Sequence, residues 1–524
     1  MKLKNYFHSP YILFLIAIFT AFFLPQVFII LDDVSLISAY ETDAGSIINA
    51  IEDLFKFPIY SMFNGFHSKF YGWTYMAINF AVLAPVKLFL FAIGSNDKFL
   101  VYATIKLLLF ALGLASVLAF FEVAVRCFKN NAVALVVSLL YIFSPSPISK
   151  FFYFIHPEVV GNLFIFLAIL CLLNFSENQN SRSYFTGLIC LVLASLSKQI
   201  FFFLSVPILF LFFHFYCVGR NKGYLKILLS REFGKIFLRT FGVAIAILFV
   251  IHPYAFFKPA TFIQFQIDLV NQFRNNQHAS FLENFKIWKE VIVKELPIFI
   301  FMFAILPIQL IFAMSLYFNR REKKVMIYIV SIVATPIILM LIINSNRLIL
   351  APSYLQPIYS ICLLNIIATL YFLTNYKYKI IKISACISSA YLLVLLLFCG
   401  IYGTVGTLYF RLSSYKNSSS YKTYEYIKNN LTPNDKIAED HFVAIPSAMQ
   451  GNSCHYWQGC GTDYIDEFNP NYVMFNEEFR FDNSIPAPNL RLQKYISDHH
   501  LKLVTKIKAK NIENGEIEIS IYKK

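Results

Sequence analysis

Long apolar stretches separated by short polar connections fill the first 405 residues of the chain. A run of about 20 apolar residues crosses the ~30 Å hydrocarbon core of a membrane as a helix. The pattern therefore predicts a polytopic α-helical membrane protein with about 11–13 transmembrane helices over residues 1–405. The candidate stretches lie near residues 10–31, 74–94, 99–121, 132–148, 157–175, 184–197, 199–217, 240–257, 296–318, 325–343, 348–373 and 380–404.

The first stretch does not have the features of a cleaved signal peptide. It is too long, and Asp32, Asp33 and Val34 follow where small residues would precede a cleavage site. We therefore expect this stretch to remain as the first membrane helix, with its start held in the cytoplasm by Lys2 and Lys4.

Beyond residue 405 the pattern changes. Long apolar runs end, and charged residues, Asn and Pro become more frequent. Residues 424–431 have the pattern of a helix, residues 471–475 and 502–507 that of short strands, and residues 516–522 alternate as in a strand. Residues 406–524 are therefore predicted to form a small soluble α/β domain.

Lys and Arg are concentrated in alternate connections, which predicts the orientation of the helices. The basic connections contain Arg126 and Lys129 or fall within residues 220–239, 320–324 and 377–382. With these in the cytoplasm, the loops 32–73 and 258–295 and the domain 406–524 lie on the outer side. Twelve full crossings from a cytoplasmic N-terminus would instead leave the C-terminal domain inside. The stretch 74–94, which contains Pro85 and Lys87, is the candidate for an incomplete crossing.

Composition and charge agree with a membrane protein. Hydrophobic residues make up 58% of the chain and charged residues 14%, which leaves too little polar surface for a water-soluble protein of this length. The formal net charge of +15 needs no nucleic acid partner. Anionic headgroups of the cytoplasmic leaflet explain it.

The first outer loop contains the strongest candidate for catalysis, Asp43. Apolar residues at positions 44, 47, 48, 51, 54 and 55 predict a helix with one apolar face that lies on the membrane surface. Thr42 would cap this helix, and its dipole would favour the ionised form of Asp43, as a general base requires. The alternative is that Asp43 only completes the helix N-terminus. Asp32, Asp33 and Glu41 are competing carboxylates.

Further polar residues lie on the predicted outer side. His67 and Lys69 belong to the first loop, and His156 and Glu158 stand at the outer end of a span. A carboxylate at mid-membrane costs about 2.5–3.5 kcal/mol, and less near the surface, unless it faces a polar cavity. One His with one Glu is only a weak indication of a metal site.

Two isolated cations, Lys198 and Arg347, occupy turns on the side that should lack basic residues. Such cations favour an anionic ligand at the membrane surface, for example a lipid phosphate. The alternative is that each side chain only extends toward the membrane interface.

Two cysteines, Cys454 and Cys460, lie six residues apart in a loop of the predicted outer domain. We expect a disulfide between them, which would be stable in a periplasm. Two unpaired thiols are the alternative, because spacing alone does not determine geometry.

Taken in order, these residues resemble the GT-C class of integral-membrane glycosyltransferases, in particular the protein mannosyltransferase and aminoarabinose transferase group. The resemblance rests on Asp43 in a surface helix after the first span, Glu158 at the next outer turn, and Ser197-Lys198. It also rests on Arg347 followed by Pro352 and Pro357, and the soluble segments 426–428, 435–437 and 469–473 are similar to the tails of such enzymes.

The resemblance implies an inverting transferase that uses a sugar on a polyprenyl phosphate as donor. The acceptor would be a glycan, lipid or protein of the cell envelope, and the active site would face outward from a bacterial inner membrane. Asp43 would be the base, Lys198 and Arg347 would stabilise the lipid phosphate, and Glu158, His156, His67 and Lys69 would contact substrate. Many relatives have Asp-Glu where this chain has Asp43 and Ala44, which leaves a bound divalent metal open.

Two other functions stay open at this stage. A transporter or flippase of a lipid-linked saccharide would also place lone charges along a membrane path, although the chain has no visible internal repeat of the kind many transporters show. A non-catalytic factor in cell-envelope assembly is the third hypothesis.

Overall fold

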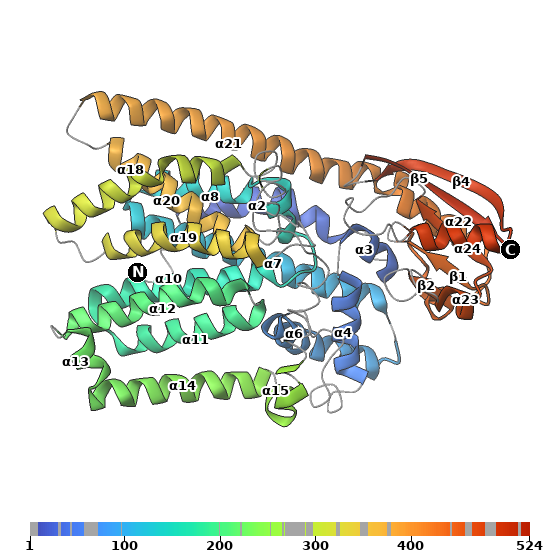
Figure 1. The fold of residues 1–524 in the computed structure, drawn as a ribbon, viewed down its shortest axis with the longest axis horizontal. Helices are drawn as coiled ribbons and strands as arrows, with labels where there is room; N and C mark the ends of the chain where they lie inside the picture. The colour runs from blue at the N-terminus through green and yellow to red at the C-terminus, as the bar shows by residue number, and fades with distance from the viewer. Residues whose placement is uncertain are drawn as a thin grey trace. The chain divides into compact units, whose positions relative to one another are not determined.

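The computed structural model describes most of the chain, and the ribbon is drawn in Figure 1. The residues that it describes are 9–29, 33–41, 44–56, 72–95, 97–198, 200–220, 223–251, 253–261, 263–264, 267, 289, 297–320, 325–345, 355–374, 379–440, 443–455, 464–476, 489–511 and 515–524. Most of the predicted outer loop 258–295 falls outside these residues.

Each of the predicted apolar stretches coincides with a helix, and the polytopic α-helical fold is confirmed. The helices are α2 (Pro10–Val27), α6 (Trp73–Ala92), α7 (Lys98–Phe128), α8 (Asn131–Ile142), α10 (Glu158–Asn178), α11 (Ser181–Ser197), α12 (Ile200–Gly219), α14 (Arg231–Ile251), α18 (Pro297–Arg320), α19 (Val325–Ser345), α20 (Gln356–Thr374) and α21 (Lys379–Ser414). Among the described residues, six of them are long and apolar enough to cross a membrane, namely α2, α6, α7, α10, α12 and α14.

Several helices depart from their predicted bounds, and the reason for α8 lies in the local sequence. Helix α8 ends at Ile142 rather than near residue 148, because Pro145 and Pro147 follow and proline disfavours helix at the residue before it. The segment after it forms only the short α9 (Ser146–Ser149) and η1 (Lys150–Phe152). Helices α7 and α21 are longer than predicted, with 31 and 36 residues.

The described part of the predicted outer loop 32–73 contains two helices. The predicted surface helix is α4 (Ala44–Lys56), whose apolar positions, among them Ile47 and Ile51, are buried while Asn49 is exposed. Helix α3 (Val34–Tyr40) was not predicted. Asp33 caps its first turn by accepting a hydrogen bond from the backbone N–H of Ser35, which explains why a helix begins there.

Contacts between Cα atoms divide the chain into two compact units. One contains residues 1–24, 50–89 and 105–405, and the other contains residues 25–49, 90–104 and 406–524. In the first unit α10 packs on α11 and α12, α18 packs on α19, and α19 packs on α20. Aromatic rings fill the space beside α2, where Phe19 contacts both Phe110 of α7 and Phe152, with ring centroids 5.4 Å apart in each pair.

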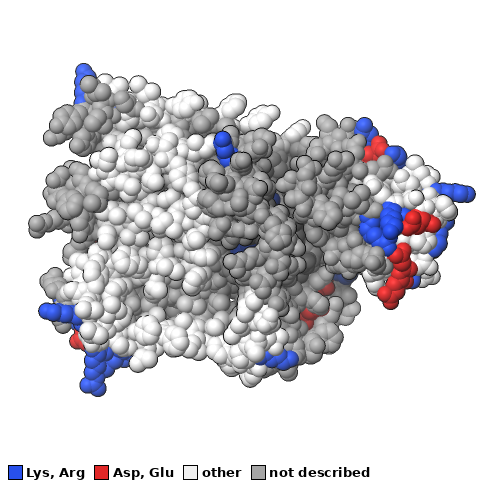
Figure 2. Space-filling view, in the orientation of Figure 1, with Lys and Arg blue, Asp and Glu red and all other residues white. Residues whose placement is uncertain are grey.

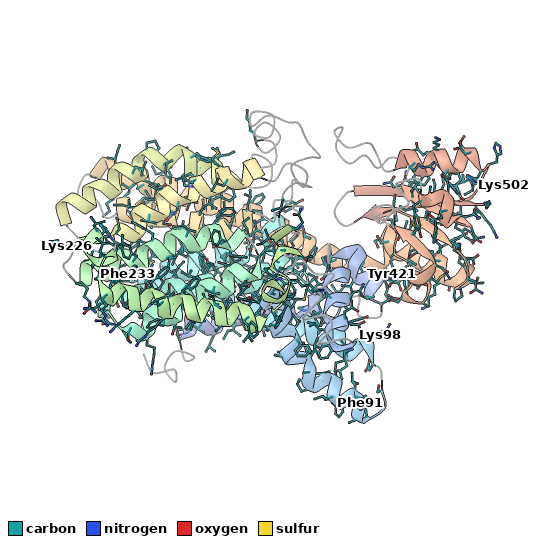
Figure 3. All side chains as sticks on the ribbon, turned by 60° about the horizontal axis from the view of Figure 1, so that its bottom comes forward. Phe91, Lys98, Lys226, Phe233, Tyr421 and Lys502 are labelled. Carbon is teal, nitrogen blue, oxygen red and sulfur yellow. The ribbon has the colours of Figure 1, made fainter. Side chains whose placement is uncertain are left out.

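Charge is distributed unevenly over the first unit. On the face drawn in Figure 2 its described surface is mostly white, while several Lys and Arg side chains lie at the end that carries α13 (Tyr224–Leu228) and the start of α14. Figure 3 labels Lys226 and Phe233 at this end. An apolar flank with a basic end is the surface expected of a membrane protein with its positive connections on one side.

The second unit contains a five-stranded sheet, so the predicted α/β domain at the C-terminus is confirmed. The strand order is β2-β1-β3-β5-β4, with β1 parallel to β2 and β3, and β5 antiparallel to β3 and β4. The strands are β1 (Ile437–Glu439), β2 (Ser453–His455), β3 (Tyr472–Asn476), β4 (Lys502–Asn511) and β5 (Gly515–Lys523). The shorter strands β1 and β2 were not predicted.

Helices cover the sheet and complete two apolar cores. Ile427 of one helix packs with Met474 and Ile519 from the sheet, and Leu492 and Tyr495 of another pack with Val473. The remaining helices in order are α15 (Tyr254–Phe257), η3 (Tyr415–Asn417), α22 (Ser419–Asn430), η4 (Ser447–Asn452), α23 (Tyr464–Phe468) and α24 (Asn489–Asp498).

Candidate functional site

Three of the predicted site residues meet at a buried carboxylate. Glu158 opens α10 and is fully buried. Lys198, the residue that ends α11, contacts Oε1 of Glu158 through its Nζ, and the Nδ1 of His156 contacts Oε2. The Lys198 side chain is 13% exposed. The structure thus brings His156, Glu158 and Lys198 into one cluster, which we call the Glu158 cluster.

Two glycines allow the backbone to approach closely around this cluster. A Cβ atom on Gly72 would lie 1.4 Å from the carbonyl oxygen of Ser197, and one on Gly161 would lie 2.1 Å from the ring of Phe201. Larger residues would therefore separate the start of α6 from the end of α11, and α10 from α12. Thr74 strengthens the first contact by donating a hydrogen bond to the Leu193 carbonyl at 2.8 Å.

The loop that contains His67 and Lys69 leads directly into this contact. It ends at Gly72, which touches the residue before Lys198. His67 and Lys69 themselves lie outside the described residues, as do Asp43 and Arg347. Their assigned roles remain predictions.

Sequence reasoning missed Lys106, which lies inside the apolar helix α7. It is 2% exposed, and its Nζ donates a hydrogen bond to the Tyr153 carbonyl at 2.7 Å. Tyr153 belongs to the segment that leads to His156, so Lys106 holds the backbone that positions the cluster. The available signal was a single Lys within the stretch 99–121, similar to the one that drew attention to Lys198.

Asp33 collects hydrogen bonds from residues far apart in the chain. It accepts from the N–H and hydroxyl of Ser35, from the hydroxyl of Tyr424 at 3.2 Å, and from the N–H and hydroxyl of Ser447. Burial raises the pKa of Asp33, but the hydrogen bonds from Ser447 and Ser35 lower it more, and the pKa lies below its ordinary value. These hydrogen bonds give Asp33 a structural role in joining α3 to the C-terminal domain.

A second buried contact joins the first loop to the end of α21. The guanidinium Nη2 of Arg411 lies 3.3 Å from Oε1 of Glu41, and both side chains are 2% exposed. In a buried ion pair, loss of one partner leaves a charge without compensation in a dry environment. This contact and the Asp33 contacts lie in the compact unit that joins the start of the first loop, up to Asn49, to the C-terminal domain.

Two further predictions concern metal ions and the disulfide. Within the described part of the chain, no three His, Cys, Asp or Glu side chains group in a way that would hold a metal ion. Cys454 is disulfide-bonded. Its predicted partner Cys460 lies outside the described residues, so that pairing stays a prediction.

Comparisons with known proteins identify the fold. No family model matches the chain, and no curated protein sequence matches it. The structure of ArnT from Cupriavidus metallidurans in the apo state matches with a TM-score of 0.50 at 12% identity, covering 97% of each chain. The same protein bound to undecaprenyl phosphate gives 0.50 and 11%, again over 97% of each chain. The chain has a GT-C fold.

The similarity extends more weakly to an archaeal protein. The oligosaccharyltransferase of Archaeoglobus fulgidus, in complex with Zn and sulfate, matches with a TM-score of 0.46 at 12% identity, covering 89% of this chain and 68% of the other. The ArnT structures, and not this weaker match, confirm the expected resemblance to the GT-C class for the fold. At these identities the comparison does not assign roles to residues.

Within the GT-C fold, the Glu158 cluster concentrates charge where three apolar helices begin or end. Glu158 starts α10, Lys198 ends α11, and α12 begins two residues later. An ammonium ion held by a buried carboxylate at such a position is suited to bind an anion that arrives from the membrane surface. The imidazole of His156 contacts the other carboxylate oxygen. Lys198 and His156 together therefore determine the position of the Glu158 side chain.

Proposed function

We propose that the chain is a membrane glycosyltransferase. It transfers a sugar from a polyprenyl-phosphate donor to a cell-envelope glycan, lipid or protein on the extracytoplasmic face, with inversion at the anomeric carbon. The Glu158 cluster is the observation that carries the proposal, because it places a cation at the helix ends that border the first outer loop. The GT-C fold over nearly the whole chain supports it, and one of the matching structures contains undecaprenyl phosphate.

Asp43 serves as the general base in this proposal. Its carboxylate takes the proton of the acceptor hydroxyl while the hydroxyl oxygen forms a bond to the anomeric carbon. The bond from that carbon to the phosphate oxygen breaks, and its electron pair leaves with the lipid phosphate. Asp43 then releases the proton to water.

Lys198 and Arg347 stabilise the charge that develops on the leaving phosphate. Glu158 and His156 hold the Lys198 side chain in place, and Lys106 holds the segment that ends at His156. His67 and Lys69 contact the bound substrates from the loop that ends at Gly72. The cluster thus supplies a positioned cation for the leaving phosphate.

Purified protein in detergent or nanodiscs tests this function. We expect a radiolabelled polyprenyl-phosphate sugar to lose its label to an envelope acceptor without any membrane gradient, and the Lys198→Met variant to lose that transfer. A chain that moves lipid-linked saccharide only across sealed vesicles, and forms no glycosylated product, would be a transporter or flippase instead.

The substrate and its cellular place follow from a deletion strain. We expect loss of the gene to leave an envelope glycan, lipid or protein without one sugar, in a bacterium whose inner membrane contains the protein. Accumulation of the unmodified acceptor would identify the acceptor class, and an unchanged envelope composition would contradict the proposal.

A further inference from the structure

The turn between α6 and α7 presents an apolar tip that nothing in the described chain covers. Phe91 is 86% exposed and lies at the end of this hairpin, with Lys98 on the helix that follows (Figure 3). Further large apolar side chains around the turn are exposed as well, namely Leu88, Phe89, Ile93 and Phe99. A contiguous apolar patch of this kind marks a surface that another apolar phase covers.

Helix α6 packs on elements of the predicted outer side along its length. Its first turn is hydrogen-bonded to the last turn of α11 through Thr74. Further along, the ring of Phe80 stacks on Phe55 of the surface helix α4 at 4.8 Å, and Nζ of Lys87 lies 6.0 Å from the centre of the same ring. If α6 crossed to the cytoplasm, only about one of its turns could contact a helix that lies on the outer surface. Phe80 and Lys87 are about two turns apart, and both contact Phe55 of α4.

The direction of α7 gives the same result. Lys106 contacts the Tyr153 carbonyl, and Tyr153 stacks on Phe23 near the outer end of α2. At the other end of α7, Phe128 contacts Tyr371 in the last turn of α20, just before the basic connection 377–382. Helix α7 therefore runs from the outer side inward, and the turn that precedes it lies on the outer side.

Length shows that part of α7 stands outside the hydrocarbon core. Its 31 residues extend about 46 Å at 1.5 Å per residue, against about 30 Å for the core. The first third of α7 and the end of α6 therefore do not cross toward the inner side and lie at the outer interface, between the headgroups and the outermost acyl segments. Residues 90–104 also belong to the same compact unit as the C-terminal domain.

We propose that α6 does not cross the membrane, and that the α6–α7 hairpin instead inserts its apolar tip into the outer leaflet of the membrane that holds the protein. Phospholipid acyl chains cover Phe91 and its apolar neighbours, and Lys87 and Lys98 reach the headgroup phosphates beside them. Asp97 caps the start of α7 by accepting from the Leu100 N–H at 3.3 Å. Eleven of the twelve predicted apolar stretches then cross, which reconciles a cytoplasmic N-terminus with an outer C-terminal domain.

Cysteine labelling in intact cells tests the side of the tip. Ser95→Cys places a thiol in the exposed turn, with Asp498→Cys as an outer reference and Lys226→Cys as an inner one. Relative to the unsubstituted chain, we expect an impermeant maleimide to label the first two in intact cells and the third only after permeabilisation. Labelling of Ser95→Cys only after permeabilisation would overturn the proposal, and so would inner labelling of Asp498→Cys, which would also reverse the proposed orientation.

Spin labelling of the full chain in nanodiscs tests insertion. A label on Phe91→Cys should collide with lipid-soluble oxygen more than with a water-soluble nickel chelate. Two positions that are each 47% exposed serve as references, Phe249→Cys on α14 and Tyr464→Cys in the C-terminal domain. We expect Phe91 to resemble Phe249. Preference for the nickel chelate would show that the tip lies in water. Protection from both reagents would show that protein covers the tip. Either result would overturn the proposal.

Discussion

Asp33 accepts a hydrogen bond from the backbone N–H of Ser447 at 3.1 Å, although 414 residues separate them in the chain. The Ser447 hydroxyl donates to the other carboxylate oxygen, and the same carboxylate caps α3. The side chain of Asp33 thus caps α3 in the first loop and also binds Ser447 of the C-terminal domain. Docking of the domain and folding of α3 therefore depend on each other.

We predict that Asp33→Asn destabilises both α3 and the segment around Ser447. Hydrogen bonds to a charged acceptor are stronger than those to an amide, and a loss of about 1–2 kcal/mol would raise local hydrogen exchange about 5- to 30-fold in α3 and around Ser447. In the native chain this stabilisation is present above the ordinary Asp pKa of about 3.9 and is lost as the pH falls through the lower pKa of folded Asp33. Asp498→Asn, at an exposed position, is the control and should change neither segment.

Glu439 should make the C-terminal domain less stable at alkaline pH. Burial in β1 raises its pKa well above the ordinary value, and the charge of Asp440 raises it further. Because folded Glu439 binds its proton more tightly than the unfolded chain does, stability falls as the pH rises from about 4.3 through the raised pKa. Glu439→Gln should therefore stabilise the domain at pH 8 and much less at pH 5, measured by hydrogen exchange of β1 and β3. Equal effects at both pH values, or the same gain from the exposed Glu467→Gln, would contradict this cause.

The ion pair between Glu158 and Lys198 should show strong coupling. Removing one partner of a buried pair costs about 3–5 kcal/mol, while replacing both with uncharged residues costs less. We expect Glu158→Gln and Lys198→Met each to lower thermal stability in detergent, and the double variant to recover part of the loss without recovering sugar transfer. The exposed pair of Arg220 and Glu232, whose side chains are 50% and 64% exposed, is the matched control and should couple by about 0–1 kcal/mol.

Substitution of Asp43 tests the proposed base. Asp43→Asn keeps the size of the side chain and its capacity to cap a helix, but it cannot accept the hydroxyl proton. Expression should persist while transfer falls about 10²-fold or more, measured by single-turnover transfer from a defined donor. Asp32→Asn should have a much smaller effect. Near-normal transfer by Asp43→Asn would exclude this residue as the base and make Glu158 the next candidate.

Periodicity predicted the secondary structure well wherever an element buries a continuous apolar face. Helices α10 and α12 and strand β3 have this property, whereas α14, which has no buried residue, was predicted from the length of its apolar run alone. Strands β1 and β2 have three residues each, which is too short for alternation to distinguish them from a loop. Helix α3 escaped prediction because its seven residues depend on a capping carboxylate and on partners in a distant domain.

The sequence by itself determined that the chain is a membrane protein with a soluble end, because the length of each apolar run and the placement of Lys and Arg depend only on local order along the chain. It also indicated His156, Glu158 and Lys198 as candidate site residues, because polar and charged side chains are rare beside long apolar stretches. Only the tertiary structure decided that these three share one carboxylate, that Lys106 supports them, and that Asp33 binds the C-terminal domain. Apart from the contact between His156 and Glu158, these contacts join positions separated by 40 to 414 residues. Side-chain partners at that separation are selected by the packing of helices, which periodicity does not encode.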